Sequence, residues 1–172
     1  MDKNIIQSDK SALIKFIKNS NKFTQGLKVK EFEKKWSKWL GVKYSTFVNS
    51  GASANFLSLN ILSEINNRKE VIIPAFTWNS DVVSVMKAGF KPIFLDINFK
   101  NLAIDEKLLI KSINKNTAGI FITHAMGFMG LSKNLLKIIR RKKIFLIEDV
   151  CESHGIKLGN KKGGTLGNIS NF

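Results

Sequence analysis

The stretch IFLIED, residues 144–149, is an apolar run that ends abruptly in two acids, Glu148 and Asp149. A polar loop that ends in a glycine, residues 150–155, follows it. In open α/β sheets ligands gather at the carboxyl ends of the strands, so an acid placed where a strand stops is well aimed at a cationic group. We therefore interpret Asp149 as a ligand for a protonated ring nitrogen or a metal. From this segment alone, capping of the next turn is the alternative.

Short apolar runs alternate along the chain with segments whose apolar residues recur at helical spacing. This alternation predicts parallel βαβ units with helices covering the sheet, an α/β fold of three layers. We expect Trp36 and Trp39, which lie on one predicted helix, to be core residues. The predicted strands are 44–48, 71–73, 92–95, 118–123 and 144–147. The predicted helices are 13–17, 29–40, 80–88, 105–113, 131–139 and one that starts after Gly51, and a hairpin is predicted at 156–163.

The chain has 172 residues, of which 44% are hydrophobic, enough for a globular domain with a core. No apolar stretch approaches the length of a membrane span, and the first residues lack the apolar centre of a signal peptide. The single cysteine, Cys151, fits a reducing compartment. We therefore expect a cytoplasmic protein with no membrane partner.

The net charge of +15 raises nucleic acid as a partner. The basic residues, however, are spread along every segment, and Arg68, Arg140 and Arg141 are the only arginines among them. Arginine is the residue suited to bidentate recognition of bases and phosphates. We therefore expect no nucleic-acid partner.

A second chemical segment is NSGASA, residues 49–54, where a glycine and small residues open a helix. Free backbone N–H groups and the helix dipole at such a position can bind phosphate. The chain contains neither G-x-x-x-x-G-K-[ST] nor G-x-G-x-x-G, so the common nucleotide motifs do not account for it. Ordinary helix capping is the alternative.

A third segment, PAFTW at residues 74–78, also follows a predicted strand and brings the Trp78 indole to the same edge of the sheet. An aromatic ring there can stack on a flat ligand, although packing in the core is the commoner role of tryptophan. Together the three segments suit one molecule with a phosphate, a planar ring and a basic ring nitrogen. Pyridoxal 5′-phosphate (PLP) has all three.

An ordered set of motifs resembles the DegT/DnrJ/EryC1/StrS family of PLP-dependent sugar aminotransferases, which have fold type I, over nearly the whole chain. The motifs that carry the resemblance are TQG at 24–26, FE at 32–33, NSG at 49–51, PAFTW at 74–78, GFKPIFLD at 89–96, HAMG at 124–127, ED at 148–149 and GGTLG at 163–167.

The resemblance implies a role for five residues of this sequence. Gly51 and Ala52 would offer N–H groups to the cofactor phosphate, Trp78 would stack on the ring, and Asp149 would hold the protonated pyridine nitrogen. Glu152 fills a position, often glutamine in the family, near the cofactor and the sugar. Ala52 departs from the family pattern, because it stands where a threonine or serine is usual.

The resemblance also implies a domain plan. Residues 1–40 would be a helical segment that packs on the large domain, and 41–172 an incomplete PLP-binding large domain. The Schiff-base lysine is expected just after Phe172, and the C-terminal small domain is absent. We therefore expect a fragment or truncated protein, inactive by itself, with no catalytic residue in the chain.

The activity that the resemblance implies for the parent enzyme is transfer of an amino group from glutamate to a 4-keto or 3-keto nucleotide-linked sugar, in amino-sugar and surface-polysaccharide (lipopolysaccharide, O-antigen) biosynthesis. The family also implies a homodimer. One alternative is a sugar 3-dehydratase that uses pyridoxamine phosphate (PMP), with a histidine in place of the lysine. An alternative of another class is a non-catalytic cofactor-binding remnant.

Two other local interpretations concern the histidines. Asp149, Cys151 and His154 mimic a nucleophile set, but their spacing is poor for a thiol enzyme. A metal site built on His124, His154, Asp149 and Glu152 would lack any recognised ligand spacing, so no metal is expected. For His124 we predict a buried, hydrogen-bonded side chain instead.

Overall fold

The computed structural model describes residues 4–172, which form two compact units that divide between Phe47 and Val48. The first unit holds two helices, α1 (Gln7–Asn19) and α2 (Leu27–Leu40). Gly41 ends α2 in the left-handed conformation, with φ of 87°, and its N–H donates to the Ser37 carbonyl. Glycine is the residue that most readily takes this conformation at the end of a helix.

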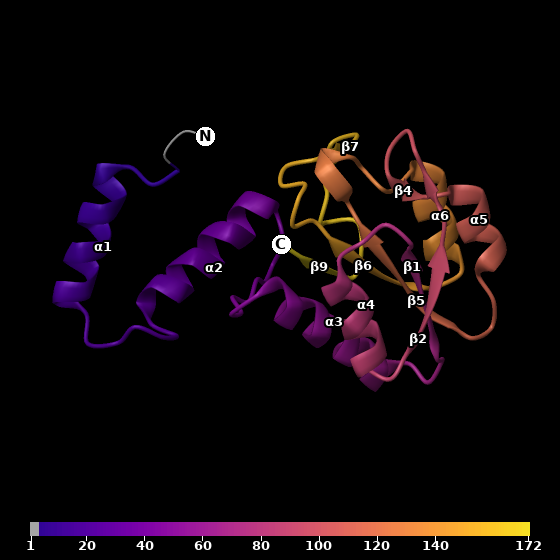
Figure 1. Ribbon diagram of the computed structural model, residues 1–172, viewed down its shortest axis with the longest axis horizontal. Coiled ribbons are helices and arrows are strands. Elements are labelled where there is room, and N and C mark those ends of the chain that lie inside the picture. Colours follow the sequence, from indigo (N-terminus) through magenta and orange to yellow (C-terminus); the bar gives the residue numbers. More distant parts are fainter. Residues whose placement is uncertain (1–3) are drawn as a thin grey trace. The chain divides into compact units, whose positions relative to one another are not determined.

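The second unit alternates strands with helices and confirms the predicted α/β class (Figure 1). Its five-stranded sheet is parallel throughout, in the order β2-β1-β5-β6-β9. The sheet strands are β1 (Glu70–Pro74), β2 (Lys91–Leu95), β5 (Thr117–Thr123), β6 (Phe145–Asp149) and β9 (Ile169–Asn171). The helices are α3 (Gly51–Ile65), α4 (Asn79–Lys87), α5 (Glu106–Ser112) and α6 (Lys133–Arg141), with a 3₁₀ turn, η1 (Ala125–Gly127).

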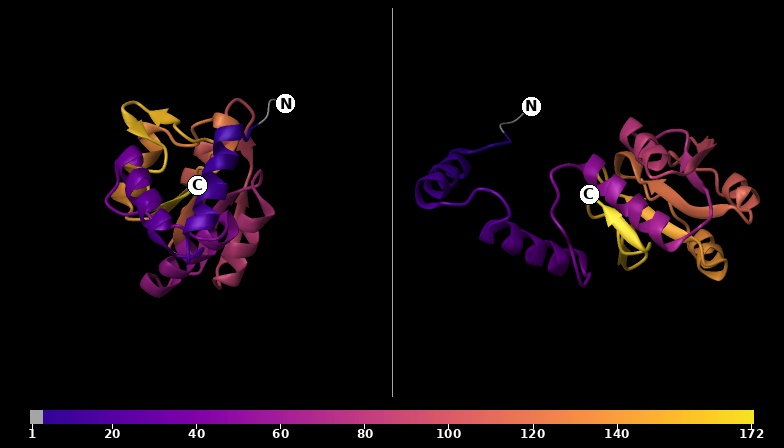
Figure 2. Two further views of the ribbon diagram at one scale, coloured as in Figure 1. Left: turned by 90° about the vertical axis from the view of Figure 1, so that its left-hand side faces the viewer. Right: turned by 90° about the horizontal axis from the view of Figure 1, so that it is seen from below.

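Two small hairpins lie outside the sheet. One pairs β3 (Ile97–Asn98) with β4 (Ala103–Ile104). The other, which the sequence predicted, pairs β7 (Lys157–Leu158) with β8 (Lys161–Lys162). Strand β9, bright yellow in the right-hand view of Figure 2, is the last strand of the parallel sheet.

Each face of the sheet packs against one pair of helices, which gives the three layers of the predicted fold (Figures 1 and 2). Side chains of α3 and α4 form one core cluster with Val71 and Ile73 of β1, whereas those of α5 and α6 form the other with Ile72. Successive residues of a strand point to opposite faces, so β1 supplies both cores. Burial on both faces explains why the strands are almost continuously apolar.

Two local predictions were wrong. Residues 44–48 form no strand, because within residues 4–172 no strand pairs with them, and the Phe47 N–H donates to the Glu33 carboxylate, at 2.8 Å. The tryptophans of α2 are not core residues either. Trp39 is 42% exposed and Trp36 is only half-buried; Trp36 stacks on Phe32 and packs against Trp39.

Helix boundaries differ from the prediction by one or two residues in most helices, and by more in the first. The first helix runs over 13 residues rather than the five predicted. Helix α6 begins at Lys133, two residues later than predicted, because Ser132 is its N-cap and accepts from the Leu135 N–H. The predicted packing of residues 1–40 on the large domain stays a prediction. In residues 4–172 no helix combines the length and the hydrophobicity needed to cross a bilayer.

We predict that Gly167→Ala destabilises the fold by about 2 kcal/mol, the usual cost of overpacking. A Cβ at this position would lie 2.7 Å from the Leu146 carbonyl oxygen, which cannot retreat because it also accepts from the Asn168 N–H. Chemical denaturation of the two proteins measures the difference. Gly51→Ala is the matched control, since a Cβ there meets nothing within 4 Å. Equal stabilities for Gly167→Ala and the wild type would contradict the packing described.

Candidate functional site

Asp149 is the last residue of β6, and its carboxylate is buried at the carboxyl end of the parallel sheet. One oxygen, Oδ1, accepts from the Cys151 N–H at 2.9 Å, and the other, Oδ2, accepts from the Asn55 side-chain amide at 3.2 Å. These two bonds hold the carboxylate in a fixed orientation and leave it further lone pairs. The strand therefore delivers Asp149 where the sequence predicted, with capacity for one more donor.

A second buried carboxylate, Asp81 on α4, was missed by the sequence analysis. It is fully buried and accepts from Asn55 at 2.7 Å, from Thr77 at 2.5 Å and from Thr123 at 3.2 Å. Burial raises the pKa of Asp81 to about 6; the hydrogen bond from Thr77 works against this, and the charge of Asp149 adds to it. Its position one turn before Ser84 and Val85, both buried, was the signal that this acid faces inward.

Gly51 and Ala52 open helix α3, and both are exposed. Ser50 caps the helix by accepting from the Ser53 N–H at 3.2 Å. The N–H groups of the first helical residues have no acceptor within the helix, so those of Gly51 and Ala52 point outward with the positive end of the helix dipole. A Cβ at Gly51 would project into open space. This geometry suits a phosphate.

Trp78 precedes α4 at the carboxyl end of β1, and its side chain is 51% exposed rather than packed in the core. Trp78 lies close enough to the thiol of Cys151, two residues beyond Asp149, to influence its pKa. Burial, followed by the hydrogen bonding and the charge of the Asp149 carboxylate, raises the pKa of Cys151 to about 12, whereas Trp78 acts in the opposite direction. A thiol that stays protonated is a poor nucleophile, which argues against the thiol-enzyme interpretation.

Glu152 lies in the exposed loop after β6 and accepts from the Met126 N–H at 2.9 Å. Met126 is in the 3₁₀ turn η1, where its φ of 51° is left-handed. Next to it, the Gly127 N–H donates to Ser153 at 2.9 Å. The loops after β5 and β6 are thus tied together, and Glu152 takes part as an acceptor of a backbone bond.

The predicted residues come from neighbouring elements. Trp78 and Asp149 both act on the pKa of Cys151, and Asn55 joins Asp149 to the first turns of α3, the helix that Gly51 and Ala52 open. Glu152 is joined to the loop after β5 rather than to Asp149 or Trp78.

The model of the DegT/DnrJ/EryC1/StrS aminotransferase family matches residues 4–172. The chain belongs to this family. It is 36% identical, over 92% of its length and 42% of the relative's, to GDP-4-keto-6-deoxy-D-mannose 3-dehydratase of Yersinia pseudotuberculosis. It is 30% identical, over 87% of its length and 40% of the relative's, to GDP-perosamine synthase of Vibrio cholerae.

A solved structure agrees with this assignment. The crystal structure of GDP-4-keto-6-deoxymannose-3-dehydratase with a trapped PLP-glutamate geminal diamine superposes with a TM-score of 0.84 at 31% identity, and the match covers 92% of this chain and 42% of that one. The predicted family and its fold are confirmed. The chain spans less than half the length of each of these relatives.

The described residues fit the cofactor of this DegT-family relative. The fit rests on a buried acceptor, Asp149, at the end of β6, on the outward N–H groups of Gly51 and Ala52, and on the half-exposed indole of Trp78. In residues 4–172 no group of three or more histidine, cysteine, aspartate or glutamate side chains is arranged to hold a metal ion.

His124 is fully buried and hydrogen-bonded, as predicted, and its partner is Glu148. The Nδ1 atom accepts from the Gly130 N–H at 3.0 Å, so Nε2 carries the proton and donates to Glu148, also at 3.0 Å. The Glu148 carboxylate further accepts from the N–H groups of Gly164, Leu166 and Gly167, at 2.7–2.9 Å. This acid of the ED motif thus holds the GGTLG loop in place.

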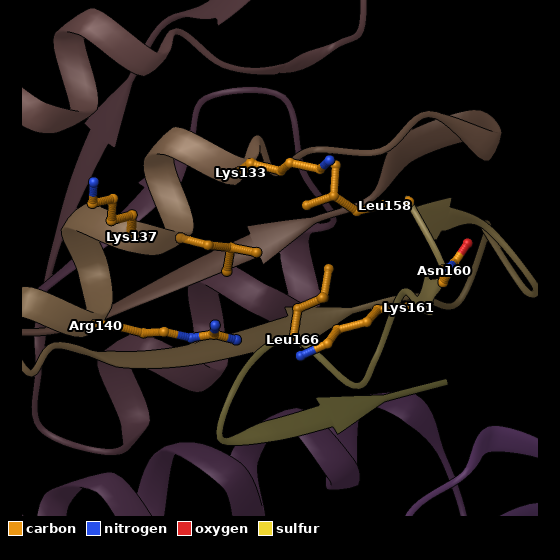
Figure 3. A pocket seen from close by; sticks show the side chains of 9 residues that line it. Lys133, Lys137, Arg140, Leu158, Asn160, Lys161 and Leu166 are labelled. Atoms are coloured by element: carbon orange, nitrogen blue, oxygen red, sulfur yellow. The ribbon is translucent and has the colours of Figure 1, made fainter.

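A cavity of about 630 Å³ lies elsewhere, between α6 and the β7–β8 hairpin (Figure 3). It contains none of the predicted cofactor residues. Its lining includes leucine side chains and four basic ones, those of Lys133, Lys137, Arg140 and Lys161. Asp149, the predicted acceptor for a ring nitrogen, lies at the carboxyl end of β6 and does not line this cavity.

We predict that Glu148→Gln lowers the free energy of unfolding at pH 7 by about 2–4 kcal/mol, because charge-assisted bonds to a buried acceptor are lost. Burial alone would raise the pKa of Glu148, but the bonds from His124 and Gly164 outweigh it and hold the pKa below the ordinary 4.5. Glu148 therefore stabilises the fold above pH 4.5, and this contribution disappears as the pH falls through the lowered pKa.

Urea denaturation between pH 3 and 7 tests this. The difference in the free energy of unfolding between the wild type and Glu148→Gln should become smaller as the pH falls. Glu152→Gln is the control, since that exposed acid accepts a single backbone bond. A gap that stays constant over the whole range would show that the charge of Glu148 is not what holds the loop.

Proposed function

We propose that the full-length protein is a PLP-dependent aminotransferase that moves the amino group of glutamate to the keto carbon of a GDP-linked sugar. The observation that carries the proposal is the buried Asp149 carboxylate, fixed by two hydrogen bonds at the end of β6, in a chain that belongs to this family. PLP, when bound, supplies an electron sink for the bonds at the amino-bearing carbon.

Each predicted residue has one task in this proposal. Asp149 accepts a hydrogen bond from the protonated ring nitrogen, and its negative charge keeps that nitrogen protonated. The N–H groups of Gly51 and Ala52 bind the phosphate, where Ala52 provides no hydroxyl contact. Trp78 covers one face of the ring with its exposed indole. Glu152 stays near the sugar as an acceptor on the joined loops.

The substrate class follows from the relatives. Those at 36% and 30% identity are both named for GDP-linked sugars, and one solved relative holds PLP joined to glutamate. We therefore choose a GDP-linked 4-keto sugar as the acceptor and glutamate as the donor. A homodimer, a role in surface-polysaccharide biosynthesis and a cytoplasmic location remain part of the proposal.

A 3-dehydratase of the same family is the second candidate. The observation that favours it is the name of the relative at 36% identity. In such an enzyme the amino group would not remain on the sugar product, and the sugar's 3-hydroxyl would be lost as water. The residue expected just after Phe172 separates the two, with a lysine for the aminotransferase and a histidine for the dehydratase.

We predict that the full-length protein, given PLP, ¹⁵N-glutamate and GDP-4-keto-6-deoxy-D-mannose, produces 2-oxoglutarate and a sugar nucleotide that carries ¹⁵N. Mass spectrometry of the sugar nucleotide reads the label directly. A product without label that has lost its 3-hydroxyl would replace the aminotransferase with the dehydratase. No change in the sugar nucleotide under these conditions would overturn both.

We predict that Asp149→Ala lowers kcat roughly a hundredfold or more, a common cost of removing one electrostatic group from an active site. The loss should be chemical rather than structural, because the ring nitrogen loses the anion that keeps it protonated. Asp149→Asn is the matched variant, since it keeps the shape and removes the charge, and it should lose similar activity. Near-normal turnover by Asp149→Ala saturated with PLP would show that the ring nitrogen is placed wrongly.

A further inference from the structure

Asp149 does not stand alone at the sheet edge, because one amide joins it to the second acid. The Asn55 Nδ2 atom donates to Asp81 at 2.7 Å and to Asp149 at 3.2 Å. An amide nitrogen has two protons, so both are used on carboxylates. The two acids belong to α4 and β6, and Asn55 of α3 is their link.

The orientation of this amide is fixed from the other side. The Asn171 side chain on β9 donates to the Asn55 Oδ1 atom at 2.7 Å, and Ser58 lies 2.8 Å from the Asn171 Oδ1 atom as its donor. A flip of Asn55 would turn its oxygen toward two carboxylates and its nitrogen toward a donor. With both acids ionised, the favourable arrangement is therefore the one in which Asn55 offers protons to both acids.

The whole network is shielded from water. Asp81, Asn55, Ser58, Asp149 and Asn171 are each at most 5% exposed. Burying two carboxylates a single amide apart is unfavourable unless they are compensated. Donors from Thr77 and Thr123 compensate Asp81 in part. A cation held at Asp149 would compensate the pair further.

We propose that Asp81 is a positioning residue for the cofactor: through Asn55 it fixes the Asp149 carboxylate, and it adds a second negative charge behind it that strengthens the hold on the protonated ring nitrogen. The inference rests on the proposed function, because it needs a ring nitrogen at Asp149. It assigns a task to an acid that the family resemblance left without one.

The charge of Asp81 gives this role a pH dependence. Its pKa is raised to about 6, first by burial and also by Asp149, so Asp81 is ionised mainly above pH 6. The titratable groups that face it are Asp149 at the end of β6 and the Cys151 thiol beyond it. Its partners Asn55, Thr77 and Thr123 do not titrate. The second charge is therefore available at neutral pH and is lost below pH 6.

The experiment uses the full-length protein and PMP with a ¹⁵N-labelled ring nitrogen. The ¹⁵N chemical shift reports whether this nitrogen is protonated, and titration calorimetry gives the PMP dissociation constant. For Asp81→Asn at pH 8 we expect a dissociation constant about tenfold higher and a ring-nitrogen titration about one pH unit lower than in the wild type. Below pH 6 the two proteins should converge, because Asp81 is then protonated in both.

Asp105→Asn is the matched control. It makes the same chemical change, and asparagine still caps α5, so both readings should equal those of the wild type. A purely structural role for Asp81 would lower the melting temperature and leave the ring-nitrogen titration unmoved. That result would overturn the inference.

Asn55→Ala keeps both acids and removes the amide that joins them, so it tests the link even if Asp81→Asn fails to fold. We expect weaker PMP binding and a lowered ring-nitrogen titration here too. Unchanged values in Asn55→Ala would overturn the link. If the wild type itself binds no PMP, the proposed function fails; if the wild type binds and the variants match it, only this inference fails.

Discussion

The arrangement around Asp149 depends on one set of interactions, the hydrogen bonds to the buried Glu148 carboxylate. This carboxylate accepts four hydrogen bonds, one from His124 and three from the N–H groups of the loop 163–167. That loop carries the chain from the β7–β8 hairpin into β9, whose Asn171 belongs to the network around Asp149. A charged group with no exposed surface is stable only when it is paired so completely.

Glu148 and Asp149 are consecutive residues with different tasks, and the strand geometry separates them. Side chains of a strand alternate between faces. Along β6, Leu146 belongs to the α5–α6 core and Ile147 to the α3–α4 core. Glu148 accordingly holds the loop, whereas Asp149 meets Asn55 of α3, which links it to Asp81 of α4. Glu148 thus stabilises the scaffold, and the Asp149 carboxylate lies at the carboxyl edge of the sheet.

Local patterns were enough to predict most of the fold. The alternation of apolar strands and amphipathic helices predicted the parallel sheet, and the end of the last apolar run predicted that Asp149 stands at the carboxyl end of a strand. Residues 44–48 were read as a strand because a β pattern records local preference, whereas a strand exists only with a neighbour to pair with. Trp36 and Trp39 have helical spacing, but spacing alone does not supply a surface to cover them.

The sequence analysis also failed to identify the buried polar residues on helices. Asn55 and Asp81 stand in helices where a polar side chain ordinarily faces solvent, and only the folded structure brings them within hydrogen-bonding distance, although they are 26 positions apart in sequence. Asn171 is farther still from Asn55 along the chain. No window of sequence contains such a network.

The adjacency of the two acids on β6 also limits how this sequence can vary in length. Side chains alternate between the two faces of a strand, so a one-residue deletion or insertion within β6 would turn every later side chain of the strand to the opposite face. The loop-holding acid would then face α3 and α4, and the acid of the sheet edge would face the loop. The β7–β8 hairpin has two residues per strand and lies outside the sheet, so a change in its length would not alter which face the residues of β6 occupy. Changes in chain length should therefore be absorbed there and excluded from β6.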